Sequence, residues 1–254
     1  MGDERDKLDG KSLAIGVDVG ATKIAAALVT SGGQVLQARL VRTVPDRGRQ
    51  AVLDSIAALV EALRAQAPAP PLGAGIGTPG RVDAEAGIVH NAVNLGWDEV
   101  HLVAEIRARL AVALPVWVQK DANASALGEY YFGAAAGCQD FVYLSVGSGL
   151  GGGVLTGGKL VTGANWNAAE LGHLSLDPNG QLCACGGRGC AETVISGPGL
   201  LALAPHVVLL TYAIIALFPI IMILMNSFKG RRAIFGQPFQ PPTAETFETR
   251  YWRR

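Results

Sequence analysis

The sequence has no excess charge of either sign, few aromatic residues and only four cysteines. Its 21 lysines and arginines balance 21 aspartates and glutamates, and aromatic residues make up 6% of the chain. No basic stripe with interleaved aromatic residues is present, which argues against a nucleic-acid partner. The first twelve residues, MGDERDKLDGKS, have no apolar core and do not resemble a secretory signal peptide. We therefore expect the first part of the chain to be cytoplasmic, where structural disulfides are rare.

Charged residues are also absent from one stretch near the end, residues 207–225, with the sequence VVLLTYAIIALFPIIMILM. About 18 or more such residues are enough to cross a bilayer as a helix. Pro219 is tolerated in a membrane span more readily than in a soluble helix. A buried helix or strand pair of a soluble core is the alternative. The tail that follows, residues 226–254, is basic and without periodicity, and we expect it to be mostly loop.

Glycine is abundant, with 33 residues, and short apolar runs alternate with glycine-containing turns and helical patterns. This alternation predicts an α/β protein with two related lobes and a ligand site in the cleft between them. Period-two alternation predicts strands, and apolar residues three and four apart predict helices. The expected strands lie at 15–19, 24–29, 35–41, 72–78, 115–119, 141–146 and 150–161, and the expected helices at 49–66, 102–110 and from 121 onward.

Two glycine turns lie between expected strands. The first is DVGATK, residues 18–23, and the second is SVGSGLGGG, residues 145–153. Backbone N–H groups of such turns can surround phosphate oxygens, and a carboxylate such as Asp18 can hold Mg²⁺ directly or through water. Ordinary hairpin turns are the alternative for each turn taken alone. Neither turn has the spacing of a Walker loop.

Asp121 lies where an expected strand ends and an expected helix begins. The side chain could cap the helix, a role worth about 1 kcal/mol. It could also act as the general base that accepts the proton of a substrate hydroxyl during phosphoryl transfer. The sequence pattern leaves both roles open.

Three of the four cysteines lie within eight residues, in the segment CACGGRGC. Cys183, Cys185 and Cys190 have the spacing C-x-C-x₄-C, and a tetrahedral zinc site requires a fourth ligand. His173, ten residues earlier, fits this role better than Cys138, which we interpret as a buried structural thiol. The pattern favours a structural Cys₃His zinc site over reactive thiols.

Several motifs occur in the order found in one known family. DVGATKIAAALV, GIGTPGRVD, DANASALGE, SVGSGLGGGV, AELGHLSL and CACGGRGCAETVISGPGL resemble the ROK family of bacterial sugar kinases and related repressors, over residues 12–202. The resemblance is greatest to glucokinase-type members. It implies a two-lobed actin/hexokinase-like (RNase H-like) α/β fold, with a flexible segment 1–11, an N-terminal lobe 12–120 and a C-terminal lobe 121–204 carrying the zinc knuckle. Because family members continue well beyond SGPGL, the second lobe is expected to be incomplete.

The resemblance implies ATP-dependent phosphorylation of a glucose-like hexose at its 6-hydroxyl, with Asp121 as the base. It also implies assembly into dimers or tetramers. The residues expected to bind the sugar are Gly77, Asn94, Glu170, His173 and Glu192. Those expected to face ATP and Mg²⁺ are Asp18, Gly20, Thr22, Lys23, Gly147, Ser148, Gly149 and Gly151. Structural Zn²⁺ would be held by His173, Cys183, Cys185 and Cys190, with His173 using its other ring nitrogen for the sugar.

Two departures from the family pattern bear on this prediction. Lys120 replaces an asparagine that binds the sugar in the family, and an ammonium beside Asp121 is expected to lower the pKa of that carboxyl. Residues 206–252 instead resemble the first span and following loop of a carbohydrate ABC-transporter permease. The alternative function is therefore a permease fragment, joined to a non-catalytic ROK remnant and anchored to the membrane through residues 207–225. A ROK repressor is disfavoured, because no helix-turn-helix fits ahead of Asp18.

Overall fold

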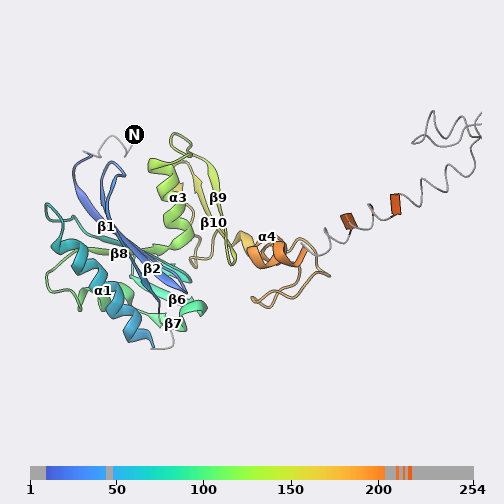
Figure 1. The fold of residues 1–254 in the computed structure, drawn as a ribbon, viewed down its shortest axis with the longest axis horizontal. Coiled ribbons are helices and arrows are strands. Elements are labelled where there is room, and N and C mark those ends of the chain that lie inside the picture. The colour runs from blue at the N-terminus through green and yellow to red at the C-terminus, as the bar shows by residue number, and fades with distance from the viewer. Residues whose placement is uncertain (1–9, 44–47, 204–209, 212–213, 215–216, 219–254) are drawn as a thin grey trace, which may run out of the picture.

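The computed structural model describes residues 10–43, 48–203, 210–211, 214 and 217–218. Two parts of the chain lie side by side in it (Figure 1). The first region, residues 13–120, contains a five-stranded sheet and a smaller three-stranded sheet. The second region, residues 121–203, contains a helix packed on a third sheet, followed by a segment with little regular structure.

The five-stranded sheet has the order β3-β2-β1-β4-β8. The first three strands form antiparallel pairs along the chain, whereas β4 is parallel to both β1 and β8. This mixed arrangement places the carboxyl ends of β1, β4 and β8 at one edge, where the functional residues are described below. The strands are β1 (Leu13–Val19), β2 (Lys23–Thr30), β3 (Val35–Arg42), β4 (Ala74–Thr78) and β8 (Val116–Lys120).

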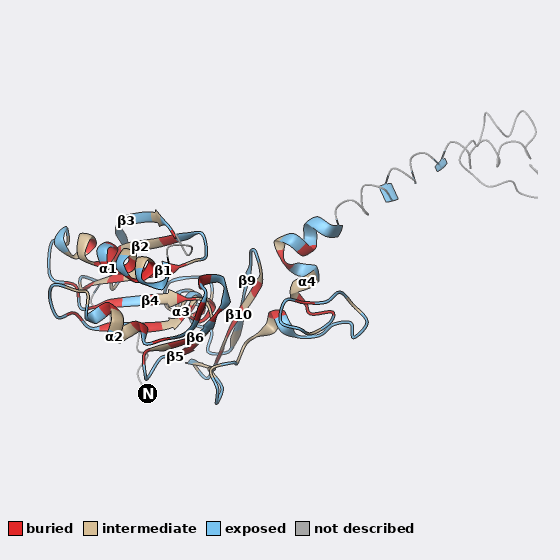
Figure 2. Ribbon diagram, turned by 90° about the horizontal axis from the view of Figure 1, so that it is seen from below, coloured by how far each residue is buried: buried red, intermediate tan, exposed pale blue. Residues whose placement is uncertain are grey.

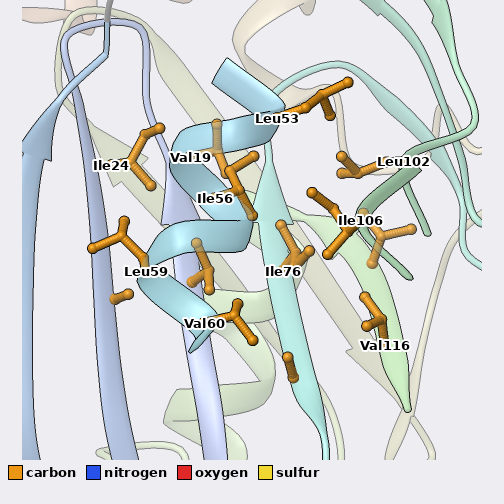
Figure 3. Packing of buried hydrophobic residues seen from close by; sticks show 14 of the residues in the cluster. Val19, Ile24, Leu53, Ile56, Leu59, Val60, Ile76, Leu102, Ile106 and Val116 are labelled. Atoms are coloured by element: carbon orange, nitrogen blue, oxygen red, sulfur yellow. The ribbon is translucent and has the colours of Figure 1, made fainter. Parts of the chain in front are cut away.

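Two helices, α1 (Arg49–Ala65) and α2 (Leu102–Arg107), cover one face of this sheet. Apolar residues of α1 recur three and four positions apart, so they lie on one side of the helix. Ile56 of α1, Ile76 of β4 and Ile106 of α2 point toward one another in Figure 3 and are almost fully buried. The burial of this apolar surface stabilises the first region, and the sequence correctly predicted the strands and helices that provide it.

The opposite face of the sheet carries small side chains. Asp18 at the end of β1, and Lys23 and Val29 near the two ends of β2, are the larger alternate residues on this face of β1, β2 and β4; the others are glycine or alanine. Most of these small residues line an open, mainly apolar groove of about 740 Å³, together with Trp117 of β8, whose side chain is 58% exposed. The same strands therefore carry bulky residues toward α1 and small ones toward the groove.

The second sheet of the first region was not expected from the sequence. It consists of β5 (Arg81–Asp83), β6 (Ile88–Ala92) and β7 (Trp97–Val100), joined as antiparallel neighbours, with a 3-10 turn, η3 (Val93–Leu95), between β6 and β7. Its strands are three to five residues long and have no sustained alternation, which explains why pattern analysis missed them.

The second region begins with α3 (Asp121–Phe132), which packs on β9 (Phe141–Val146) and β10 (Leu150–Thr156). Gly153 permits this close approach, because a Cβ there would lie 2.7 Å from the Ala126 Cβ. A short strand, β11 (Lys159–Leu160), completes the sheet. The 3-10 turn η4 (Leu171–His173) and the short helix α4 (Glu192–Ile195) flank the cysteine-rich segment.

The structure corrects one expectation and leaves another outside its range. Cys138 is exposed, not buried, because it lies in the irregular connection between α3 and β9. The membrane span predicted at 207–225 falls largely outside the described residues, which include only 210, 211, 214, 217 and 218 of it. Within the described part of the chain, none of the helices combines the length and hydropathy that crossing a bilayer requires.

Candidate active site

A cleft of about 730 Å³ lies between the two regions and collects most of the predicted site residues. Its walls come from the ends of β1 and β8, the start of α3, the β9–β10 turn, and the loop before η4. The predicted residues that line the cleft are Asp18, Asn94, Asp121, Gly147, Ser148, Gly149, Gly151, Glu170, His173 and Glu192. The predicted residues outside its lining are Gly20, Thr22, Lys23, Gly77, Cys183, Cys185 and Cys190.

Strand register explains why Asp18 and Asp121 meet although a hundred positions separate them in the sequence. Asp18 of β1 is in register with Gly77 of β4, and Gly77 is in register with Gln119 of β8. Asp121 follows two residues later, so both carboxylates lie at the carboxyl ends of parallel strands, one on each side of β4. Ligands of open α/β sheets bind at this edge. A Cβ at Gly77 would lie 3.6 Å from the Asp121 Cα, an ordinary van der Waals distance, so Asp121 lies directly beside the end of β4.

Asp121 is the first residue of α3, and Lys120 occupies the N-cap position without a side-chain capping bond. The Asp121 Oδ1 accepts a hydrogen bond from the Ala122 N–H at 2.7 Å. Burial raises the pKa of the Asp121 carboxyl above its ordinary value, and the negative charges of Asp18 and Glu170 raise it further. The Ala122 N–H and the positive charge of Lys120 oppose this shift.

This result corrects the expectation that Lys120 lowers the pKa of Asp121 below its ordinary value. Lys120 acts in the expected direction, but the loss of hydration around Asp121 outweighs it. An aspartate with a raised pKa is a better proton acceptor than an exposed one, provided that it is ionised at the working pH.

Lys120 itself is nearly buried, with 8% of its side chain exposed. Its Nζ lies 2.6 Å from the Glu170 Oε1 on the opposite wall of the cleft. Lysine is almost never fully buried unless it is paired, so the ion pair accounts for its position. The sequence could not identify this partner, because Glu170 follows Lys120 by 50 residues and belongs to a loop.

The second glycine turn is fixed to the segment that follows the cysteines. Within the turn, the Gly147 N–H donates to the Gly149 carbonyl at 2.9 Å. The Glu192 Oε2 accepts the Leu150 N–H at 2.9 Å, and the Gly197 N–H donates to the Gly147 carbonyl at 2.8 Å. A Cβ at Gly149 would lie only 2.5 Å from the Glu192 Oε2, so a larger residue there would displace the end of the Glu192 side chain. Glu192 therefore holds the turn as well as lining the cleft.

The first glycine turn is stabilised in a similar way but lies at the border of the cleft. The Gly20 N–H donates to the Lys23 carbonyl at 2.9 Å, and the Thr43 hydroxyl donates to the Gly20 carbonyl at 2.7 Å. Asp18, just before the turn, is exposed and faces the cleft. Thr22 and Lys23, within the turn, are exposed as well.

The ligand atoms of His173, Cys183, Cys185 and Cys190 all lie within 4.8 Å of one another. The Cys183 Sγ is 3.8 Å from the His173 Nδ1, and the Cys185 Sγ is 3.6 Å from the Cys190 Sγ. A tetrahedron with zinc–sulfur bonds of about 2.3 Å has edges of about 3.8 Å, so the cluster fits Zn²⁺. Because the Nδ1 faces the thiols, the Nε2 of His173 is left for the cleft.

The thiols of this cluster differ in their proton affinity. The Gly187 N–H and the neighbouring thiols lower the pKa of Cys185. Burial and the same neighbours raise the pKa of Cys190 to about 12. Such crowding of thiols is unfavourable for several thiolates at once, and a bound dication would compensate it.

The structure adds three cleft residues that sequence analysis did not identify: Arg81, Asn91 and Asn167. Asn91 has a φ of 51°, a conformation that asparagine adopts more readily than most residues. Trp166, with a φ of 56°, stacks on His90 at a centroid distance of 5.7 Å and so connects the second region to β6. The sequence signal for Asn91 and Asn167 was the asparagine-rich composition of the segments 91–94 and 165–167.

Comparisons with known proteins agree with this geometry. The model of the ROK family matches residues 14–210. The glucokinase of Streptomyces coelicolor is 41% identical over 192 residues, which cover 76% of this chain and 59% of that protein. The xylose repressor of Caldicellulosiruptor bescii is 36% identical over 197 residues, or 76% of this chain and 49% of the repressor.

Among solved structures, the ROK family glucokinase from Streptomyces griseus, in complex with glucose and AMPPNP, superposes with a TM-score of 0.68. It is 41% identical to this chain, and the match covers 76% of this chain and 60% of that one. The chain thus spans about 59% of the length of the glucokinases it matches.

Proposed function

This chain belongs to the ROK family, and from this premise we propose that it transfers the γ-phosphoryl group of ATP to the 6-hydroxyl of a glucose-like hexose. One observation carries the proposal. A single cleft contains Asp121, a partly buried carboxylate of raised pKa, together with the β9–β10 glycine turn and the side chains of Glu170, His173 and Glu192, which the family resemblance assigns to the sugar. The relatives that match over the same residues include proteins named as glucokinases.

In the proposed reaction, Asp121 accepts the proton of the sugar 6-hydroxyl as its oxygen attacks the γ-phosphorus. The bond from that phosphorus to the bridging oxygen breaks, and ADP leaves with the electron pair. Positioning and charge stabilisation account for most of the catalysis of such transfers. Asp18 would hold the Mg²⁺ of the nucleotide substrate, and the N–H groups of the β9–β10 turn would face its phosphates.

The sugar would lie against Glu170, His173 and Glu192, which line the same cleft and belong, like the β9–β10 turn, to the second region. Carboxylates accept hydrogen bonds from sugar hydroxyls, and the His173 Nε2 offers one further polar contact. Zinc, held by His173 and the three cysteines, would supply a structural cross-link between η4 and α4. His173 and Glu192 therefore belong to both the metal-containing wall and the sugar pocket.

A coupled assay of ADP formation with glucose and ATP tests the proposal. Asp121→Asn keeps the size of the side chain and removes the base, so we expect kcat to fall by about 10²–10⁴-fold. Asp98→Asn, which changes an exposed aspartate of β7, is the control and should retain wild-type activity. Equal rates for the wild type and Asp121→Asn would disprove the assigned role of Asp121.

The alternative, a membrane-anchored permease fragment joined to a non-catalytic ROK remnant, depends on residues 205–254. Almost all of these lie outside the described residues, and the family match ends at residue 210. Recovery of the full chain in carbonate-washed membranes, without sugar phosphorylation, would support that alternative. Recovery in the supernatant with activity would favour the kinase.

A further inference from the structure

The charges that face the cleft are unevenly distributed. Its carboxylates are those of Asp18, Asp121, Glu170 and Glu192, whereas Arg81 and Lys120 are the cations among the described lining residues. Of these two cations, Lys120 contacts a residue that is predicted to bind the sugar, through the 2.6 Å ion pair with Glu170. The position of this ammonium therefore determines how much negative charge the sugar wall presents to a ligand.

The ammonium of Lys120 has donors to spare. It carries three N–H groups and accepts no hydrogen bond, and among the described residues the Glu170 Oε1 is its one side-chain partner at hydrogen-bond distance. Because the side chain is only 8% exposed, unpaired donors there would cost free energy. A ligand that fills this part of the cleft must therefore present acceptors, such as hydroxyl oxygens, toward Lys120.

The ion pair also changes what Glu170 can bind. A free carboxylate would attract a cationic substituent, such as the ammonium of an amino sugar. In the ion pair, the positive charge of Lys120 balances the negative charge of Glu170. A cationic substituent that approached Glu170 would therefore also approach the Lys120 ammonium. Like charges placed together disfavour the wrong partner strongly enough to determine specificity.

We propose that Lys120 is a specificity-determining residue of the cleft, which holds Glu170 in place and directs the site toward neutral sugars and against amino sugars. The inference rests on the proposed function only in taking the cleft as a sugar site. A purely structural ion pair would stabilise the fold but would leave the choice between sugars unchanged.

Equilibrium binding of glucose and of glucosamine to the full chain, measured by calorimetry with the amine protonated, tests the inference. In Lys120→Gln, which removes the charge but keeps a donor near Glu170, we expect the preference for glucose over glucosamine to fall by about tenfold or more. Lys120→Arg retains the charge and should keep most of the preference. Lys159→Gln, on the exposed end of β11, is the matched control and should bind as the wild type does.

A second variant covers the case in which Lys120→Gln does not fold. Glu170→Gln leaves the ammonium without its counter-charge, so discrimination against glucosamine should increase. An unchanged ratio of the two dissociation constants in the folded variants would overturn the inference while leaving the proposed function intact. Failure of the wild type to bind glucose would overturn both.

Discussion

In the first region, buried side chains of α1, α2 and seven strands form one continuous apolar cluster, whereas the buried cluster of the second region consists of Ala126, Tyr130 and Leu155 among the described residues. Figure 2 shows the same contrast, with buried residues concentrated around β1, β4 and α1 and mostly exposed ones around α4. The second region instead has a four-residue ligand cluster and the bonds of Glu192 to the β9–β10 turn.

The difference shows that the two walls of the cleft depend on different interactions. The first wall is stabilised by the burial of apolar side chains, an interaction that does not depend on precise directions between atoms. The second wall has a few polar contacts and a cluster of residues that fits a metal, and small domains with little core are commonly stabilised in this way. The two walls should therefore respond differently to the same treatment.

Removal of zinc should produce the largest difference between the regions. Structural zinc can contribute on the order of 10 kcal/mol of folding free energy to a small domain, because its site does not exist in the unfolded chain. We expect a chelator to abolish hydrogen-exchange protection over residues 171–195 and to leave β1, β4 and α1 protected, as measured by mass spectrometry.

Cysteine variants separate the metal from a general effect of the chelator. Cys190→Ser should reproduce the loss of protection and of bound zinc, whereas Cys138→Ser, at an exposed thiol outside the cluster, should change neither. Uniform loss of protection across both regions would contradict the division drawn here.

A cavity in the apolar core should act on the first region. Ile56 of α1 is fully buried between the sheet and α2, so Ile56→Ala should lower the free energy of unfolding by about 2–5 kcal/mol, measured by urea denaturation. Val142→Ala on β9 is the control, because that side chain is 56% exposed and its loss should cost less than about 0.5 kcal/mol. Similar losses for both variants would show that the apolar core is not what distinguishes the regions.

The fall of kcat/KM at low pH should depend on the protonation of Asp121, which lies where the two regions meet. Burial raises the pKa of Asp121, and the positive charge of Lys120 partly offsets this. In Lys120→Gln the offset is lost, so the pKa of Asp121 rises further and kcat/KM should begin to fall at a higher pH on acidification. Steady-state kinetics across the acid range measure the shift. A limb that moves to lower pH, or that moves equally in Lys159→Gln, would contradict the cause given.

The smallest expected effect concerns the hairpin of the second region. The Thr156 hydroxyl and the Gly157 N–H donate to the Asp140 Oδ1 at 2.7 and 2.9 Å and lower the pKa of Asp140. This stabilisation is present above the pKa of the unfolded state and is lost as the pH falls through the lower folded value. Asp140→Ala should therefore lower the Tm slightly at neutral pH, and the two Tm values should converge in acid. A constant difference at all pH values would exclude the carboxylate as the cause.

Much of the fold could be predicted because local patterns agree with the final structure. The first three strands and α1 were expected from their apolar patterns, α3 was expected from Asp121 and the alanine-rich run after it, and the structure contains them all. The β5–β7 sheet could not be predicted, since its strands are short and are defined by their pairing. Cys138 was assigned to the interior from residue type alone, and only the packing shows that it is exposed.

Local sequence patterns also predicted the candidate site only in part. The cysteine spacing singled out the zinc ligands, and position and family resemblance singled out Asp121. The structure brings the four ligand atoms within 4.8 Å of one another and places Asp121 and His173 in one cleft. The direction in which the pKa of Asp121 departs from its ordinary value depends on burial, which a local pattern does not contain. The partner of Lys120 lies 50 residues away in the sequence, so a local pattern does not contain it either. Arg81, Asn91 and Asn167 were missed because their neighbours in space are remote in the sequence.

The contact between Lys120 and Glu170 also has a consequence for the time order of folding. It closes a segment of 50 residues, whereas Cys183 and His173 are ten residues apart. Closing the longer segment costs about 1.4 kcal/mol more chain entropy, from the logarithmic dependence on length. We therefore expect the segment from η4 to the cysteines to form early and the contact between Lys120 and Glu170 to form last. Pulse-labelling hydrogen exchange in which the cleft became protected before η4 and the cysteines would refute this order. In the expected order, the cleft is complete only when both regions already exist.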